Sequence, residues 1–310
     1  MISLAPDAYH IPVLAAEVAG LLAEARTVLD GTLGGGGHSQ LLLTQGSSVV
    51  AIDRDPRAIA EASAKLAEYE RAGKFRPFLG NFAEIDSIDA LRGARFDGVL
   101  LDLGVSSRQL DDQTRGFSFR EGAPLDMRMG DDARQSAAEL LNDAPDQHLM
   151  HLFREYADER KAPRLAREIV KRRATVPFAT SDHLVNAIRG ALGPRSGPAD
   201  FARIFQAIRI EVNDELGSLE RALPALRDRL TPGGIIVVIA YHSGEDRVVK
   251  HAFRDWSHPC TCPPRQPICV CGAVALGESV NRKAITAGER ELATNPRSRS
   301  ARLRAWRRAA

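Results

Sequence analysis

The first hundred residues alternate between short apolar runs and helical patterns. Residues 28–29, 48–52, 75–79 and 96–101 are apolar or rich in β-branched and aromatic side chains, which is typical of strands. Residues 235–240 are apolar throughout, as in a strand that is buried on both faces. Strands that alternate with helices at this spacing predict βαβ units around a parallel sheet, and therefore an α/β fold.

This alternation stops near residue 108. Residues 108–132 are rich in Gly, Asp and Arg, which predicts a long loop of the kind that often carries function. Residues 136–193 show helical patterns, and the Gly- and Pro-rich stretch at 193–198 predicts a linker. The sequence therefore predicts three segments: core residues 1–107, an inserted helical subdomain over 108–197, and further core residues over 198–310.

Composition narrows the class of protein. The chain has 310 residues, of which 44% are hydrophobic and 26% charged, as in an ordinary globular protein. Lys and Arg number 42 against 40 Asp and Glu, so the net charge of +2 indicates no polyanion partner by itself. No apolar run approaches the ~18 residues of a membrane span, and no secretory signal is visible. We expect a cytoplasmic protein without a membrane partner; the sequence indicates no oligomeric state.

A glycine-rich stretch follows the first predicted strand. Residues 29–39 read Leu-Asp-Gly-Thr-Leu-Gly-Gly-Gly-Gly-His-Ser, and three leucines then open a helical pattern. Glycines at a strand-to-helix turn let a ligand approach the main chain and the free N–H groups of the helix. The stretch predicts a nucleotide-type cofactor loop; the alternative is a plain glycine-rich turn.

Asp53 ends the second predicted strand. An acid at this place can bind both hydroxyls of an adenosine ribose. The alternative is that Asp53 caps the following helix, but Asp55, directly before Pro56, fits that role better. Both NAD and S-adenosylmethionine sites use this layout. The loop does not match Gly-x-Gly-x-x-Gly in the usual register, and an aspartate beside glycines better suits a cofactor that carries an amine and no pyrophosphate.

Motifs along nearly the whole chain, in order, resemble the bacterial MraW family of small-subunit rRNA methyltransferases. They comprise Asp30–Thr32 with Gly36–Ser39, Ala51–Pro56, Leu101–Ser107, Gln109–Asp111, Arg115–Phe119, Leu125–Met129, Phe205–Ile210 and Asn295–Arg297. The resemblance implies N4-methylation of one cytidine in the decoding centre of 16S rRNA, within the 30S subunit. It also implies S-adenosyl-L-methionine as methyl donor, and a Rossmann-like methyltransferase sheet with an inserted helical subdomain.

The resemblance also implies the residues of the site. Those that would contact the cofactor are Gly36, Gly37, His38, Asp53, Phe82, Asp102 and Gln109. Phe82 would lie against the adenine; the alternative is that it fills the core, since Phe is usually buried. Asp102 and His242 are the candidate catalytic residues.

The sequence leaves open how the target amine would be oriented. Many amino-group methyltransferases carry (Asp/Asn)-Pro-Pro-aromatic after the fourth strand, where this chain has Asp102-Leu103-Gly104-Val105. An acceptor such as Asp102 could bind the amine and take its proton. The family usually shows Phe-His-Ser-Leu-Glu-Asp-Arg after the strand at 235–240, whereas this chain has Tyr-His-Ser-Gly-Glu-Asp-Arg. His242 is either an active-site residue or a structural one.

Three further features have two interpretations each. Phe117 and Phe119 either stack on a flipped base or anchor their loop to the subdomain. Arg164, Arg167 and Lys171 share one helix face that is either an RNA contact or solvated surface. The arginines that crowd residues 297–308 indicate a basic C-terminal tail that binds phosphates, unless the tail is only a disordered solubilising segment.

The cysteines form Cys-x-Cys pairs at Cys260, Cys262, Cys269 and Cys271. Four thiolates could hold zinc, but the pairs of most zinc sites are spaced more widely, so the sequence favours reduced thiols and no metal is expected. Two other functions compete with rRNA methylation. One is methylation of a small molecule or protein, and the other is a non-catalytic role in ribosome assembly, which the retained Asp102 and complete loop argue against.

Overall fold

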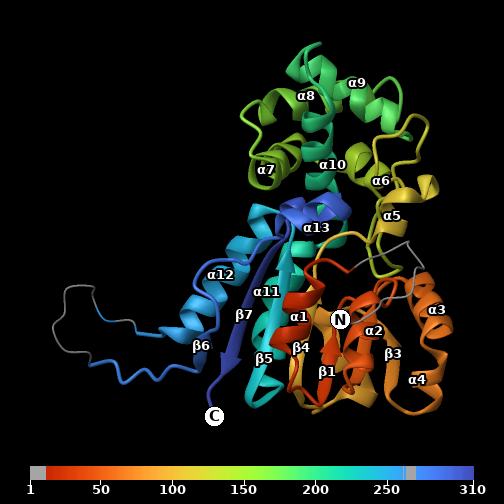
Figure 1. Ribbon diagram of the computed structural model, residues 1–310. Helices are drawn as coiled ribbons and strands as arrows, with labels where there is room; N and C mark the ends of the chain where they lie inside the picture. The colour runs from red at the N-terminus through yellow and green to blue at the C-terminus, as the bar shows by residue number, and fades with distance from the viewer. Residues whose placement is uncertain (1–11, 261, 263–269) are drawn as a thin grey trace. The chain divides into compact units, whose positions relative to one another are not determined.

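The computed structural model describes residues 12–260, 262 and 270–310 (Figure 1). The chain divides into two compact units. The sheet unit comprises the residues up to Gly104 together with Leu216–Ala310, and the helical unit comprises Val105–Glu215. Each unit is built around hydrophobic clusters of its own.

The strands of the sheet unit lie in the order β3-β2-β1-β4-β5-β7-β6. Strands β1 to β5 are parallel to one another, whereas β7 runs antiparallel to both β5 and β6. The strands are β1 (Thr27–Asp30), β2 (Ser48–Asp53), β3 (Phe75–Leu79), β4 (Phe96–Asp102), β5 (Leu230–Ala240), β6 (Gly277–Ser279) and β7 (Arg302–Arg308). The predicted α/β fold with a parallel sheet is confirmed.

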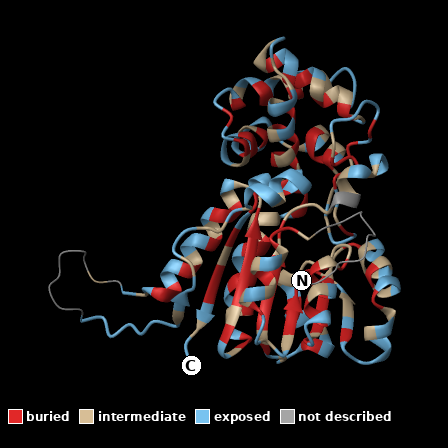
Figure 2. Cartoon of the chain, in the orientation of Figure 1, coloured by how far each residue is buried: buried red, intermediate tan, exposed pale blue. Residues whose placement is uncertain are grey.

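Helices flank the sheet because its strands are apolar on both faces, so that both faces must be covered. In the sheet unit they are α1 (Ala15–Leu21), α2 (Gly37–Thr44), α3 (Pro56–Lys65), α4 (Ala67–Arg71), α11 (Glu215–Asp228), α12 (Ser243–Ser257), α13 (Glu289–Thr294) and the 3₁₀ helices η1 (Phe82–Ser87), η2 (Asp89–Leu91) and η4 (Pro296–Ser300). Val28 packs into the cluster formed with α1, α2 and α3, and the next residue, Leu29, into the cluster formed with α11 and α12. Figure 2 shows the buried residues along the strands.

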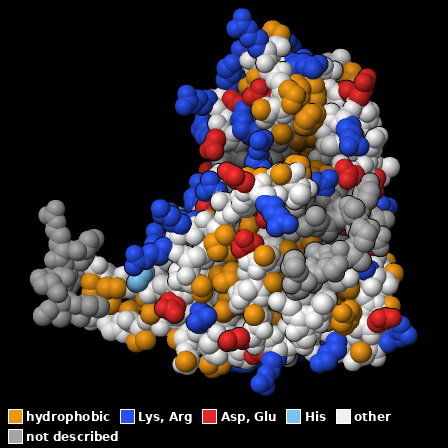
Figure 3. Space-filling view, viewed as in Figure 1, with side chains coloured by type: hydrophobic (Ala, Val, Ile, Leu, Met, Phe, Trp, Pro, Cys, Tyr) orange, Lys and Arg blue, Asp and Glu red, His pale blue; other side chains and the backbone are white. Residues whose placement is uncertain are grey.

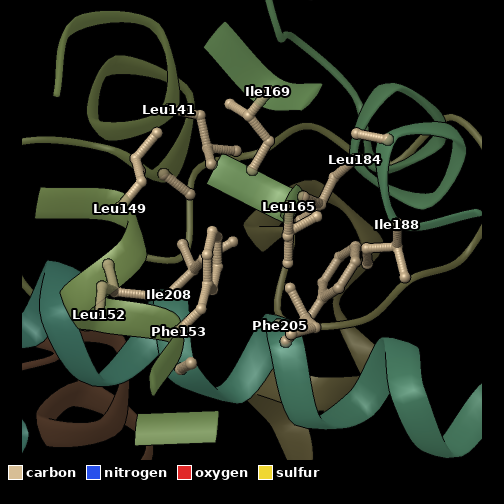
Figure 4. Packing of buried hydrophobic residues seen from close by; sticks show 14 of the residues in the cluster. Leu141, Leu149, Leu152, Phe153, Leu165, Ile169, Leu184, Ile188, Phe205 and Ile208 are labelled. Carbon is tan, nitrogen blue, oxygen red and sulfur yellow. The ribbon is translucent and has the colours of Figure 1, made fainter. Parts of the chain in front are cut away.

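The helical unit is built from α5 (Ser107–Asp111), α6 (Ala137–Asp143), α7 (Asp146–Ala157), α8 (Ala162–Arg173), α9 (Ser181–Leu192), α10 (Pro198–Asn213) and the 3₁₀ helix η3 (Gln113–Arg115). Its apolar side chains, among them Leu152, Leu165 and Ile188, converge on one core (Figure 4). The predicted inserted subdomain therefore has a hydrophobic centre that could hold it together as a unit.

The predicted end of the subdomain at residue 197 is wrong. Helix α10 lies in the helical unit, which ends at Glu215, and it buries Phe201, Phe205 and Ile208 in that unit's core. The stretch 193–198 therefore joins α9 to α10 inside the unit. Its glycines and prolines mark the end of one helix and the start of the next, which the same residue types also favour.

The C-terminal residues are not a tail. They form β7, which pairs with β5 from Ile235↔Arg307 to Ala240↔Arg302 and lies inside the sheet. Trp306 is fully buried, and its Nε1 donates to Oγ of Ser257 at 3.1 Å. The prediction of a free basic tail is therefore wrong. Among the described residues, no helix has the length and apolar character needed to cross a membrane.

Candidate active site

A buried carboxylate braces the glycine-rich loop. Asp30 ends β1 and is almost fully buried. Its Oδ1 accepts the N–H of Thr32 at 3.1 Å, and its Oδ2 accepts the hydroxyl of Ser39 at 2.7 Å. Burial raises the pKa of Asp30, while the bond from Ser39 opposes that change. Asp30 thus ties the strand end to the first turn of α2.

The loop follows a path that glycine permits. Gly34 and Gly36 have φ values of +49° and +71°, and Gly36 caps the N-terminus of α2. A β-carbon on Gly31 would lie 2.6 Å from Cδ2 of Leu101, so this turn packs directly against β4. Gly36 and Gly37 therefore stand at a helix N-terminus, a place where main-chain N–H groups commonly bind polar ligands, although the N–H of Gly36 itself donates to the carbonyl of Leu33 at 2.8 Å.

Asp53 lies beside this loop rather than capping a helix. Its Oδ2 accepts the N–H of Gly34 at 2.7 Å, and its Oδ1 accepts the N–H of Asp55 at 2.8 Å. Asp55 caps α3 by accepting the N–H of Arg57 at 3.0 Å, as predicted. Burial raises the pKa of Asp53 to about 6, although both backbone bonds lower it. A partly buried carboxyl with this pKa gains from further donors, such as a pair of hydroxyls.

Phe82 opens η1 two residues after the end of β3, at the same edge of the sheet as Asp53. Its side chain is half-buried and packs against the core, and its Cβ would lie 3.2 Å from a β-carbon on Gly31. Phe82 therefore borders the turn of the loop. Its place against an adenine ring stays a prediction.

Asp102 ends β4, and its carboxyl is contacted by a residue that the sequence analysis did not assign to the site. The hydroxyl of Tyr241 donates to Oδ1 of Asp102 at 2.7 Å. The backbone N–H of Asp102 donates to Oγ1 of Thr32 at 2.6 Å, which joins β4 to the loop. The side chain of Asp102 keeps 24% of its surface exposed, so the carboxylate is accessible to a substrate.

Tyr241 is held in place and kept protonated. Burial, reinforced by the charge of Asp102, raises the pKa of its phenol. Gly104 has a φ of +97°, and a β-carbon there would lie 3.3 Å from the Tyr241 ring. The sequence held one indication that Tyr241 matters, because this tyrosine stands where the family that the chain resembles usually has Phe.

His38 has the fewest hydrogen bonds from its side chain among the polar residues of the site. It is 7% exposed, and within the described part of the chain neither of its ring nitrogens has a hydrogen-bond partner. Nε2 lies 3.5 Å from Oδ2 of Asp102, without hydrogen-bond geometry. Buried polar atoms normally have partners. A polar ligand or water at the glycine loop would supply one.

The two remaining predicted residues have other contacts. His242 caps α12: its Nδ1 accepts the N–H of Glu245 at 3.4 Å, and its own N–H donates to Glu245 at 3.2 Å. These contacts support the structural interpretation, whereas Nε2, 3.3 Å from Oε1 of Glu245, is buried without a hydrogen-bond partner among the described residues. Gln109 belongs to the helical unit, where its Oε1 accepts the N–H of Ser106 at 2.9 Å. The catalytic role of His242 and the cofactor contact of Gln109 stay predictions.

The aromatic residues of the long loop support the anchoring interpretation. Phe117 is buried in the core of the helical unit. Phe119 is partly exposed, and its ring makes edge contacts with Phe201 at 5.8 Å and Phe205 at 6.0 Å between centroids. Phe117 is therefore a core residue rather than a platform for a base.

The glycine loop, the acid at the end of β2 and the unpartnered His38 fit S-adenosylmethionine. Its ribose would supply hydroxyl donors for Asp53, and its amino-acid part would supply polar groups near the loop. The doubly wound sheet with this loop defines a Rossmann-like, S-adenosylmethionine-dependent methyltransferase.

This chain belongs to the MraW methylase family, whose sequence model matches residues 7–309. A protein named ribosomal RNA small subunit methyltransferase H from Gemmatimonas aurantiaca is 62% identical over 299 residues, covering 96% of this chain and 95% of the relative. The protein of the same name from Heliobacterium mobile is 45% identical and covers 96% of this chain and 97% of its own.

Among solved structures, an rRNA methylase from Streptococcus thermophilus covers 96% of this chain and 94% of its own, at 10% identity and a TM-score of 0.42. That likeness is too remote to support an argument.

Proposed function

We propose that this protein methylates N4 of one cytidine in the decoding centre of 16S rRNA, within the 30S subunit, and that it works in the cytoplasm. Family membership supports methyl transfer, and the names of the two relatives support rRNA of the small subunit as substrate. The observation that carries the chemistry is the accessible carboxylate of Asp102 beside the cofactor loop.

Several residues of the sheet unit would hold the cofactor. Main-chain groups at Gly36 and Gly37 would face its amino-acid part, Asp53 would accept the ribose hydroxyls, and Phe82 would border the adenine. His38 would gain a polar partner. When bound, S-adenosylmethionine supplies an electrophilic methyl group on sulfur.

Asp102 acts on the target amine. A cytosine amine is a poor nucleophile because its lone pair is conjugated with the ring. A hydrogen bond from this amine to Asp102 would orient the nitrogen toward the methyl donor. The carboxylate would take the proton that the nitrogen loses, while the donor's sulfur would keep the electron pair of the broken S–C bond and leave as a neutral thioether. Tyr241 donates to Oδ1 of Asp102 and so fixes the carboxylate. The other oxygen, Oδ2, lies 3.5 Å from Nε2 of His38 and would be the acceptor for the amine. A carboxylate held in this way would take the place of the missing Pro-Pro-aromatic sequence.

The RNA has further candidate contacts on the helical unit. Helix α8 buries Leu165 and Ile169 and leaves Arg167 and Lys171 exposed. Figure 3 shows other Lys and Arg side chains spread over this unit. Phosphate contacts of this kind position an RNA without reading its sequence.

A transfer assay distinguishes this proposal from its two rivals. Purified protein is incubated with methyl-labelled S-adenosylmethionine and, in separate reactions, 30S subunits lacking the modification, free cytidine or protein extract. We expect label in the 30S reaction alone. Label in cytidine or protein would indicate the other enzyme class, and binding to 30S without transfer would indicate an assembly factor.

A further inference from the structure

The cysteine-containing segment between α12 and β6 brings three sulfur atoms together. The Sγ atoms of Cys260, Cys262 and Cys271 all lie within 4.8 Å of one another. Those of Cys260 and Cys271 are 3.6 Å apart. A disulfide bond is about 2.05 Å long, whereas a tetrahedral zinc ion with Zn–S bonds of about 2.3 Å holds its sulfurs roughly 3.8 Å apart. The spacing matches ligands of one metal ion.

Hydrophobic burial does not explain this convergence. Cys260 and Cys271 are exposed and Cys262 is half-buried. The neighbouring Val270 and Val274 are 75% and 78% exposed. Figure 3 shows exposed hydrophobic side chains along this part of the molecule. Among the described residues here, exposed side chains give little apolar burial to bring Cys260 and Cys271, eleven positions apart, into contact, and a metal ion would add such a constraint.

One backbone contact also favours a thiolate. The N–H of Val270 points to Sγ of Cys262 at 3.4 Å. Hydrogen bonds of this kind to ligand sulfurs stabilise the negative charge that a thiol acquires when it binds a metal. The contact therefore fits a metal-bound sulfur better than a neutral thiol.

We propose that Cys260, Cys262 and Cys271 bind one zinc ion, which links Cys260 and Cys262 to Cys271. Sulfur-rich tetrahedral sites select zinc among the common divalent ions, and the three thiols release their protons when they bind. The fourth cysteine of the motif, Cys269, lies outside the described residues, and the proposal stands on the other three. The geometry thus reverses the preference that the sequence spacing gave for unligated thiols.

The ion would have a structural role, separate from methyl transfer. The segment leads into β6, at one end of the strand order, whereas the glycine loop follows β1, and β4, β5 and β7 lie between these two strands. Loss of the ion should therefore loosen the segment and leave the cofactor site intact. This separation gives the proposal a readout that does not depend on activity.

The test uses full-length protein without a histidine tag, expressed with added zinc and purified without chelator. Elemental analysis should find about one zinc per chain, and cobalt-substituted protein should show thiolate-to-cobalt absorption. The variants Cys260→Ser, Cys262→Ser and Cys271→Ser should lose both signals. Val270→Ala is the matched control, because it changes an exposed side chain of the same segment and keeps the backbone N–H; it should bind zinc like the wild type.

Chelation supplies a test without substitution. Removing zinc from the wild type should speed proteolysis within residues 258–276 by about tenfold or more, since the local unfolding equilibrium governs cleavage. Returning zinc should restore the protection, with unchanged S-adenosylhomocysteine affinity throughout. Wild-type protein that binds no zinc, serine variants that retain it, or an iron cluster in its place would each overturn the proposal.

Discussion

The pH dependence of cofactor binding tests the role of Asp53. Because burial raises the pKa of Asp53 to about 6, its carboxyl is only partly ionised in the weakly acidic range without ligand. The folded protein holds this proton more tightly than the unfolded chain, so the carboxyl lowers stability as the pH rises from about 4 to 6. Ribose hydroxyls bond more strongly to the ionised form, and cofactor binding should therefore strengthen over the upper part of that range.

The size of the effect follows from the fraction ionised. With a pKa of about 6, roughly a tenth of the carboxyls are charged at pH 5 and nine tenths at pH 7. If only the charged form binds, affinity should rise about tenfold between these pH values, which equals about 1.4 kcal/mol.

Calorimetry with S-adenosylhomocysteine at pH 5, 6 and 7 measures this change, and Asp53→Asn is the matched variant. The variant should bind about 1–3 kcal/mol more weakly than the wild type at pH 7, with a flat pH profile. Wild-type affinity that is constant, or that falls as the pH rises, would refute the reasoning.

Three further predictions address the catalytic carboxylate, the last strand and the loop. Asp102→Asn should lower the rate of single-turnover methyl transfer by about 100-fold or more, while the affinity for S-adenosylhomocysteine stays within twofold. An equal loss of rate and affinity would contradict the proposal that Asp102 acts on the target amine. Trp306→Ala should cost about 3–5 kcal/mol of unfolding free energy in urea, against less than about 0.5 kcal/mol for the exposed Arg307→Ala; equal values would contradict the burial of β7. Gly36→Ala should lower the free energy of unfolding by about 1–3 kcal/mol, because the φ of Gly36 is +71°. Gly35→Ala should change the free energy of unfolding and the thermal stability little.

The sheet and its carboxyl edge could be predicted because local patterns determine them. Apolar runs identified the five parallel strands, and an aspartate at the end of each of three strands marked the edge that binds a ligand. The choice between Asp53 and Asp55 also followed from local rules, since a residue directly before a helix-opening proline is the natural cap.

The sequence analysis failed where the outcome depended on distant residues. The arginines of β7 suggested an RNA-binding tail, but Arg304 donates to Oδ1 of Asp246 at 2.7 Å and Arg308 donates to the carbonyl of Leu230 at 2.7 Å. No local pattern shows that a basic strand finds such acceptors more than fifty residues away. Helix α10 was misplaced for the same reason, because an apolar stripe does not say which core it joins.

The contact between Tyr241 and Asp102 joins residues 139 positions apart. The sequence placed both at the same edge of the sheet, because each directly follows a predicted strand. It could not show that the phenol reaches the carboxylate, since side-chain contact depends on strand order. Only the adjacency of β4 and β5 brings the two together.

Nucleoside analysis of methylated 30S subunits tests the central claim most directly. Subunits lacking the modification are incubated with the protein and S-adenosylmethionine, and the decoding-centre fragment of 16S rRNA is isolated by hybridisation and digested. Mass spectrometry should find N4-methylcytidine at one position in that fragment, at up to one methyl group per subunit, and Asp102→Asn should form it about 100-fold or more slowly. Methylation of another atom, another nucleoside or another region of the rRNA would contradict the account.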